Sequence, residues 1–186
     1  MQVKGYKTTA RILHWSMAAL VVATPPAGFI MAQQGIARGL QDARFLYHKH
    51  VGVLLCCWCW CGWTGGGATR HRPAPPLPGH LQPLQALMAH LSHGALYVLL
   101  LVMPIAGQVR VKAGDFPIET LDALVMPSLV ARSEAQAETA KAVHFAGGLA
   151  IAVVISMHLC AAMLPAVVLR DGIFRRMWPP FDGTPR

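Results

Sequence analysis

The chain has 186 residues, of which 54% are hydrophobic and only 13% are charged, a composition that excludes an ordinary soluble domain. Its net charge of +8 would suit a nucleic-acid-binding protein, but in so apolar a chain the basic side chains more simply mark one face of a membrane. We therefore expect an all-α membrane protein that does not bind nucleic acid.

Four apolar stretches are each long enough to cross a hydrocarbon core of about 30 Å as a helix. They cover residues 12–31, 48–64, 88–109 and 143–169, and we expect them to form a four-transmembrane-helix bundle that makes residues 1–186 a single domain. Pro25 and Pro26 lack amide hydrogens, so the first helix should kink or end near Thr24. Residues 72–83 are rich in proline and should form a stiff connector. Residues 133–141 should form a short amphipathic helix that leads into the last span.

The distribution of basic residues predicts the orientation of the chain in the membrane. Residues 110–142 contain five acidic and four basic side chains, so this connection lacks a positive bias and should lie outside. Three other segments carry an excess of basic residues and should be cytoplasmic, both termini included: Lys4, Lys7 and Arg11; Arg70 and Arg72, without an acid; Arg170, Arg175, Arg176 and Arg186.

Four histidines within the apolar stretches are functional candidates, because an imidazole in hydrocarbon must find a partner. His144 and His158 are fourteen residues apart on the fourth stretch, a spacing that puts them on nearly the same helix face and about 21 Å apart. His48 should share the outer level with His144, and His14 the inner level with His158. Two histidines at one depth on facing helices can clamp a haem iron. The sequence therefore predicts a bundle with two haems between its helices.

Several motifs in chain order strengthen this interpretation, because together they resemble the bacterial cytochrome b561 family. They are Arg11–Trp15 (RILHW), His48–Gly52 (HKHVG), His90–His93 (HLSH) with Tyr97, Pro104–Gly107 (PIAG), His144 and His158. The resemblance implies a protein of the bacterial inner membrane, surrounded by lipid, that holds two haem b groups and exchanges electrons with ubiquinone. One activity in that family is the oxidation of superoxide. Other members are cytochrome b subunits of hydrogenases and dehydrogenases.

The resemblance also assigns roles to neighbouring residues. It aligns His48 with a family ligand and places His50 where the family usually has a small polar residue, and residues two apart on a helix cannot both face one haem. His93 is a candidate for contact with quinone or a haem propionate, or it caps and packs the helix. Arg11 and Lys49 are candidates for pairing with propionates, or they are snorkelling anchors.

Residues 56–63 (CCWCWCGW) depart from the family, which has a run rich in leucine and valine there, with an arginine near its inner end. A zinc site or disulfides are poor explanations, because the run lies within a span and lacks paired CxxC spacing. The codons CTG CTG GTG CTG GTG CGG CTG encode Leu-Leu-Val-Leu-Val-Arg-Leu, and read one base later, with one G following, they encode residues 57–63. Our hypothesis is a short frameshift within residues 56–67, which sequencing of the gene from several isolates would test.

Three functions compete at this point. The first is electron transfer to or from ubiquinone, with superoxide as a small anionic donor attracted by Lys49 and Arg44, although the five acids outside oppose that attraction. The second is a membrane anchor and electron conduit for a partner dehydrogenase or hydrogenase. The third is a transition-metal transporter that uses histidine and cysteine inside the membrane.

Overall fold

The computed structural model describes residues 6–66, 82–128, 130–169 and 174–178, and this part of the chain is helical without any β-strand. The long helices are α1 (Thr8–Met31), α2 (Arg38–Gly66), α3 (Gln82–Ala113) and α5 (Glu134–Leu164). The short elements are α4 (Glu119–Ala123), the π-helical turn η1 (Pro165–Leu169) and the 3-10 turn η2 (Phe174–Arg176).

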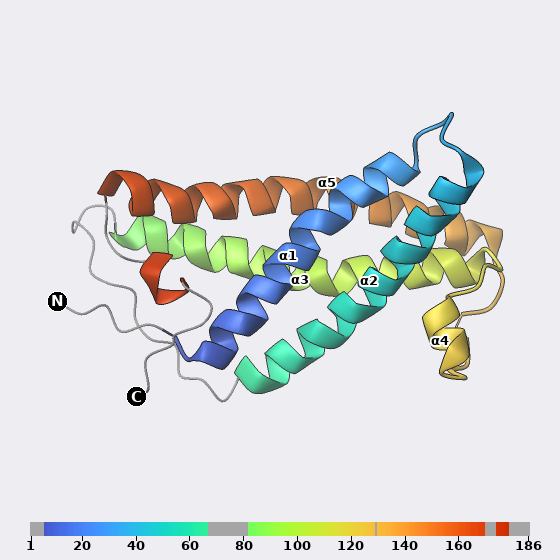
Figure 1. The fold of residues 1–186 in the computed structure, drawn as a ribbon, viewed down its shortest axis with the longest axis horizontal. Helices are drawn as coiled ribbons and strands as arrows, with labels where there is room; N and C mark the ends of the chain where they lie inside the picture. The colour runs from blue at the N-terminus through green and yellow to red at the C-terminus, as the bar shows by residue number, and fades with distance from the viewer. Residues whose placement is uncertain (1–5, 67–81, 129, 170–173, 179–186) are drawn as a thin grey trace.

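The long helices form two antiparallel pairs. Helix α3 packs along α5, α1 packs along α2, and α2 also contacts α3. The α1–α2 pair crosses obliquely over the α3–α5 pair (Figure 1). Each long helix contributes to one buried apolar cluster, which contains Val21, Val51, Leu55, Leu100 and Ile151. On every helix this cluster lies between the two predicted histidine levels, so an apolar layer separates them.

Three of the long helices are long and apolar enough to cross a membrane. They are α1, residues 86–113 of α3, and residues 134–168 across α5 and η1. This finding supports the predicted all-α membrane class, but α2 is not among the candidate spans found in the described part of the chain. The physical reason lies in its sequence, because residues 48–50 are His-Lys-His and residues 57–63 alternate cysteine with tryptophan and glycine.

Of the two outcomes predicted for the proline pair, a kink or an end of helix α1 near Thr24, the end is wrong. The helix continues to Met31 with Pro25 and Pro26 inside it. Prolines are tolerated in spanning helices where Ser or Thr hydroxyls and neighbouring groups adjust the local hydrogen bonding. Here the Thr24 hydroxyl donates a 2.6 Å hydrogen bond to the carbonyl of Leu20.

The amphipathic segment expected at residues 133–141 does form a helix, as the first turns of α5. The hydroxyl of Ser133 accepts a 3.4 Å hydrogen bond from the amide of Gln136, which is the contact of a helix N-cap. The proline-rich connector expected at residues 72–83 lies almost wholly outside the described residues, and α3 has already begun at Gln82.

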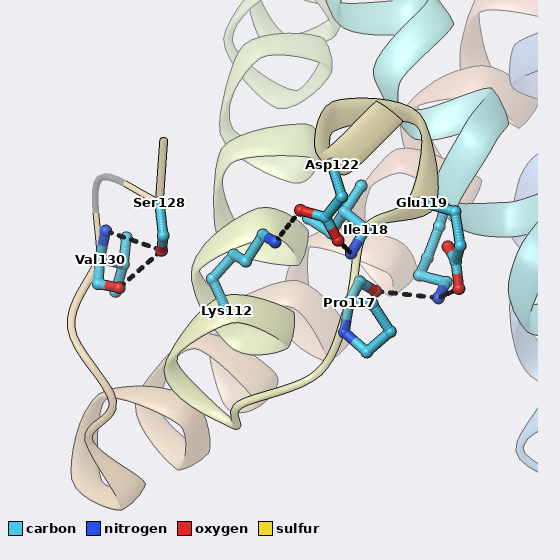
Figure 2. A network of polar contacts seen from close by, with 8 residues as sticks. Lys112, Pro117, Ile118, Glu119, Asp122, Ser128 and Val130 are labelled. Atoms are coloured by element: carbon cyan, nitrogen blue, oxygen red, sulfur yellow. Dashed lines mark hydrogen bonds and ion pairs between the residues drawn. The ribbon is translucent and has the colours of Figure 1, made fainter. Parts of the chain in front are cut away.

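Helix α4 was not expected from the sequence, in which the residues between the third span and the amphipathic segment counted only as part of the outer connection. Lys112 of α3 forms an ion pair with Asp122, whose carboxylate also accepts a 3.0 Å hydrogen bond from the amide of Ile118 (Figure 2). Lys49 of α2 forms a second ion pair, with Glu119 at 2.6 Å. Two ion pairs therefore fasten α4 to two different long helices.

The opposite end of the bundle carries both ends of the described chain. The amide of Tyr6 donates a 3.0 Å hydrogen bond to the carbonyl of Arg176. We call this end the inner end and the end that carries α4 the outer end. Of the basic residues used to predict orientation, Lys4, Arg70, Arg72, Arg170 and Arg186 lie outside the described residues.

Candidate functional site

The two histidines predicted for the outer level face each other in the structure. His48 lies in the first half of α2 and His144 lies near the start of α5. Their ring centroids are 5.9 Å apart and the rings are nearly perpendicular, at 78°. His50 is turned away, since its Nδ1 donates a 2.6 Å hydrogen bond to the carbonyl of Leu46 in its own helix. The structure thus brings together His48 and His144, as the sequence predicted.

Each ring of the outer pair has a glycine of another helix behind it. A Cβ atom added to Gly28 of α1 would lie 3.1 Å from Cε1 of His48, and one added to Gly107 of α3 would lie 3.1 Å from Cε1 of His144. Both contacts are closer than an ordinary side chain allows without a shift of the ring. Glycine at these two positions therefore leaves room for the imidazoles.

Hydrogen bonding orients one ring of the outer pair and leaves a ring atom of the other without a bond. Nδ1 of His144 lies 3.1 Å from the carbonyl oxygen of Met103. A carbonyl can only accept, so Nδ1 carries the proton and Nε2 keeps its lone pair for another ligand. Nδ1 of His48 is buried and forms no hydrogen bond of ordinary geometry within the described chain, although the backbone of Thr24 lies near the ring.

A large cavity adjoins this pair. Its volume is about 1930 Å³, and its walls include His48, His144, Gly28, Gly107 and Gly52. Pockets for drug-sized ligands are typically about 300–1,000 Å³. The cavity is therefore large enough for a macrocycle, and two imidazoles lie in its wall.

Three histidines of the described chain gather at the inner level. The ring centroids of His14 on α1 and His158 on α5 are 6.5 Å apart, with an interplanar angle of 55°. His93 of α3 lies closer still to His158, at 5.0 Å. The predicted inner pair is therefore brought together, and His93 lies at the same level, as the sequence interpretation required.

The two basic residues predicted at these levels have different surroundings. Arg11, one turn before His14, is only 4% exposed, so the structure places it inside the bundle and not at the surface where a snorkelling side chain would lie. Lys49 instead donates hydrogen bonds to Glu119, at 2.6 Å, and to the carbonyl of Pro117, at 3.0 Å. The hydrogen bond from Lys49 holds the pKa of Glu119 below its ordinary value.

Sequence reasoning missed Arg110 as a site residue and treated it only as one charge of the outer connection. Its guanidinium lies in the cavity wall, near enough to His48 and His144 to interact electrostatically with both. The other basic residues in that wall, Lys49, Arg132 and Lys141, each pair with a carboxylate, whereas Arg110 forms no ion pair with any described residue. The sequence feature that could have identified Arg110 is its position one turn after Gly107, which puts it on the face of α3 that packs against His144.

The cysteines of α2 form neither disulfides nor a metal cluster in the part of the chain that the structure describes. Cys56, Cys57 and Cys59 are free thiols. No group of three or more His, Cys, Asp or Glu side chains within the described ranges is arranged to hold a metal ion directly. The histidines face one another at two separate levels, an arrangement suited to a flat ligand held from both sides.

Comparison with known proteins gives three similarities. The sequence model of a family described as prokaryotic cytochrome b561 matches residues 5–180. The chain is 28% identical over 178 residues to the protein named cytochrome b561 homolog 2 of Escherichia coli (strain K12), which covers 92% of this chain and 90% of that protein. It is 32% identical over 112 residues to the protein named probable superoxide oxidase CybB of Yersinia pestis, which covers 60% of this chain and 62% of that protein.

Proposed function

Because the chain belongs to the prokaryotic cytochrome b561 family, we propose that it binds two haem b groups and carries electrons from superoxide to ubiquinone in the bacterial inner membrane. The observation that carries this proposal is the pair of facing histidines at each end of the bundle, one of each pair coming from α5. When bound, haem b supplies one-electron redox chemistry.

The outer residues fit such a group. His48 and His144 would hold it, because they come from different helices, face each other and lie in the wall of one cavity. The bond from His144 to the Met103 carbonyl fixes the tautomer that leaves Nε2 available. The buried, unbonded Nδ1 of His48 and the two glycines behind the rings are further features expected of a site shaped for a ligand.

The inner residues would form a second site. His14 and His158 would be the ligands there, and the buried Arg11 lies one turn from His14. Propionates are anions that favour charge-assisted hydrogen bonds, so the buried Arg11 is suited to the inner group. Lys49 also lines the outer cavity, although its ammonium is already paired with Glu119. His93 would contact a propionate or ubiquinone beside His158.

The proposed reaction is balanced without an acid or base from the protein. Two superoxide anions each lose one electron and become O₂, while ubiquinone takes these two electrons, and two protons from water, and becomes ubiquinol. The name of the Yersinia pestis relative supports superoxide as the donor. The apolar outer surfaces of α1, α3 and α5 would allow a lipid-soluble quinone to approach from the bilayer.

The same proposal places both termini in the cytoplasm. Its support is that the described ends of the chain meet at one end of the bundle, where Tyr6 bonds to Arg176 and where Lys7, Arg175 and Arg176 lie. The outer end balances its basic residues with acids, as the salt bridges of Lys49, Lys112 and Arg132 illustrate.

The test is the haem content of the purified protein in nanodiscs and of its histidine variants. We expect two low-spin haems per chain. The double variant His48→Ala/His144→Ala should keep one haem, His14→Ala/His158→Ala should keep the other, and the mixed variant His14→Ala/His48→Ala should lose both. His50→Ala and His90→Ala are matched controls that should keep both, because each ring bonds a carbonyl of its own helix. A ratio of one haem, or a mixed variant that keeps one, would exclude the proposed pairing.

A further inference from the structure

An apolar patch is exposed on the outer connection, where two of its residues, Phe116 and Met126, also lie at the wall of the outer cavity. It consists of Phe116, Leu124, Val125 and Met126, whose exposed fractions are 67%, 66%, 88% and 53%. We call these four residues the α4 patch. Three of them are consecutive and directly follow α4, beginning with its C-cap Leu124. Large apolar side chains gathered at one point of a connection between helices usually mark a contact with another molecule.

The backbone at the α4 patch makes this choice of residues more unusual. The amide of Met126 bonds to the carbonyl of Leu121 and the amide of Val125 bonds to that of Asp122, both at 3.0 Å. These are the two bonds of a Schellman motif, in which the residue at the position of Val125 takes a left-handed conformation and is usually glycine. Val125 has φ of 54°, which a β-branched residue rarely adopts. The left-handed backbone conformation disfavours valine, and so does the exposure of its side chain to water.

The two ion pairs of α4 fix the depth of the patch along the bundle. Glu119 is bound to Lys49, the residue after His48 and near the outer end of the second expected span. Asp122 is bound to Lys112, close to the end of the candidate span of α3 at Ala113 (Figure 2). Helix α4 accordingly packs against α2 at the outer end, and its Asp122 reaches the last turns of α3 through the ion pair with Lys112 (Figure 1). This is the level at which hydrocarbon meets lipid headgroups.

The patch also continues a strip of α3 that faces outward from the bundle. Leu101 and Ile105 are exposed apolar residues of the candidate span. Lys112 follows Ile105 by seven residues and therefore lies on the same helix face. Because Asp122 is bound to Lys112, α4 is attached where the lipid-facing strip ends. Lys112, which binds α4 to α3, thus lies on the same helix face as side chains that must contact lipid when α3 spans a membrane.

We propose that the α4 patch inserts into the outer leaflet of the bilayer, among the first carbons of the lipid acyl chains. Contact with lipid removes the apolar side chains from water and accounts for a valine at a position that otherwise favours glycine. Since α4 is also bound to Lys49 in the cavity wall, the lipid contact holds the connection beside the outer cavity. The inference does not depend on the identity of the electron donor.

Photocrosslinking tests the inference directly. The purified full-length protein is placed in nanodiscs that contain phosphatidylcholine with a diazirine on its acyl chain, irradiated and digested with trypsin. Cleavage after Lys112 and Arg132 releases residues 113–132 as one peptide, and cleavage after Lys141 releases residues 133–141. We expect lipid adducts on Leu124, Val125 or Met126, and none on the polar peptide 133–141. The peptide that contains residues 142–170 is the positive control, because it includes most of the span of α5.

A variant provides the second arm of the test. Leu124→Ser/Val125→Gly should reduce the adducts on residues 124–126 several-fold and leave the haem-to-protein ratio unchanged. Its matched control is Ala131→Ser, which adds a hydroxyl to the same peptide but leaves the patch intact. An unlabelled peptide 113–132 beside a labelled span of α5 would overturn the inference and indicate that the patch contacts a protein partner instead. Undiminished labelling of the double variant would overturn it as well.

Discussion

At Gly107 the backbone of α3 comes very close to the ring of His144. An added Cβ atom would lie 3.1 Å from Cε1 and 3.4 Å from Nδ1, and Nδ1 is the atom that donates to Met103. We predict that Gly107→Ala displaces this ring by a few tenths of an ångström and weakens the outer site only. The measurement is the haem-to-protein ratio, which should fall between one and two, together with a change in the electron paramagnetic resonance signal of one haem.

A matched control exists in the same protein. Nothing lies within 4 Å of a Cβ atom added to Gly39, at the start of α2. Gly39→Ala should leave both haems unchanged and should stabilise the helix slightly, since alanine is favoured over glycine by about 0.5–1 kcal/mol in a helix. Equal effects of the two variants, or loss of the inner haem from Gly107→Ala, would contradict the prediction.

Residues on regular helices were the easiest to place from the sequence. His14, His48, His93, His144 and His158 lie at the predicted levels, because helical rise and rotation fix the depth and face of each side chain. The pairing of Lys49 with Glu119 could not be predicted, because it depends on how a connection seventy residues further along the chain folds back. Arg110 was missed for a related reason, since its role follows from the ion pairs that its neighbours form.

At the scale of elements, α4 is held in place by charges that acid should neutralise. The hydrogen bonds from Lys49 and Lys112 hold the pKa values of Glu119 and Asp122 below their ordinary values. A carboxyl with a lowered pKa contributes stability that is fully present above its ordinary pKa and is lost as the pH falls through the lowered one. We therefore predict that α4 is fastened at neutral pH and loosens in acid, below about pH 4.

Hydrogen exchange of peptide 113–132 measures this fastening. Glu119→Gln should exchange faster than the natural protein at neutral pH, by no more than about fivefold, because exposed ion pairs contribute about 0.2–1 kcal/mol. The difference should vanish near pH 3, after correction for the intrinsic pH dependence of exchange. Glu134→Gln, which changes an acid in the first turn of α5, should match the natural protein at both pH values. A difference that persists in acid would show that charge does not fasten α4.

The long helices followed from hydropathy, whereas their details depended on local hydrogen bonding and on composition. The proline pair did not end α1. Helix α4 could not be predicted from the spacing of apolar residues, because five residues are too few to show a helical repeat. Helix α2 forms but is not a candidate span. The frameshift hypothesis would explain this, because residues 57–63 are less apolar than the leucine- and valine-rich run that they would replace. The frameshift hypothesis stays a prediction for gene sequencing to test.

At the scale of the whole molecule, the approach of an anionic donor depends on the field at the outer end. Most basic residues around the outer cavity are neutralised by acids, so the expectation that Lys49 attracts superoxide needs revision. Lys49→Glu is also a poor probe, because it would place two carboxylates side by side and release α4. Arg110, which has no carboxylate partner among the described residues, is the better candidate for attracting an anion.

We predict that superoxide reduces the haems at a rate that falls as ionic strength rises, because salt screens attraction beyond about 8 Å at physiological concentration. Arg110→Gln should lower the rate per bound haem several-fold and flatten its salt dependence. Arg132→Gln removes the same net charge from a residue already paired with Asp115, so it should have a much smaller effect. Stopped-flow absorbance in nanodiscs measures these rates. Equal rates for both variants at every salt concentration would exclude steering by Arg110, and no reduction by superoxide at all would favour a cytochrome that receives its electrons from a partner dehydrogenase.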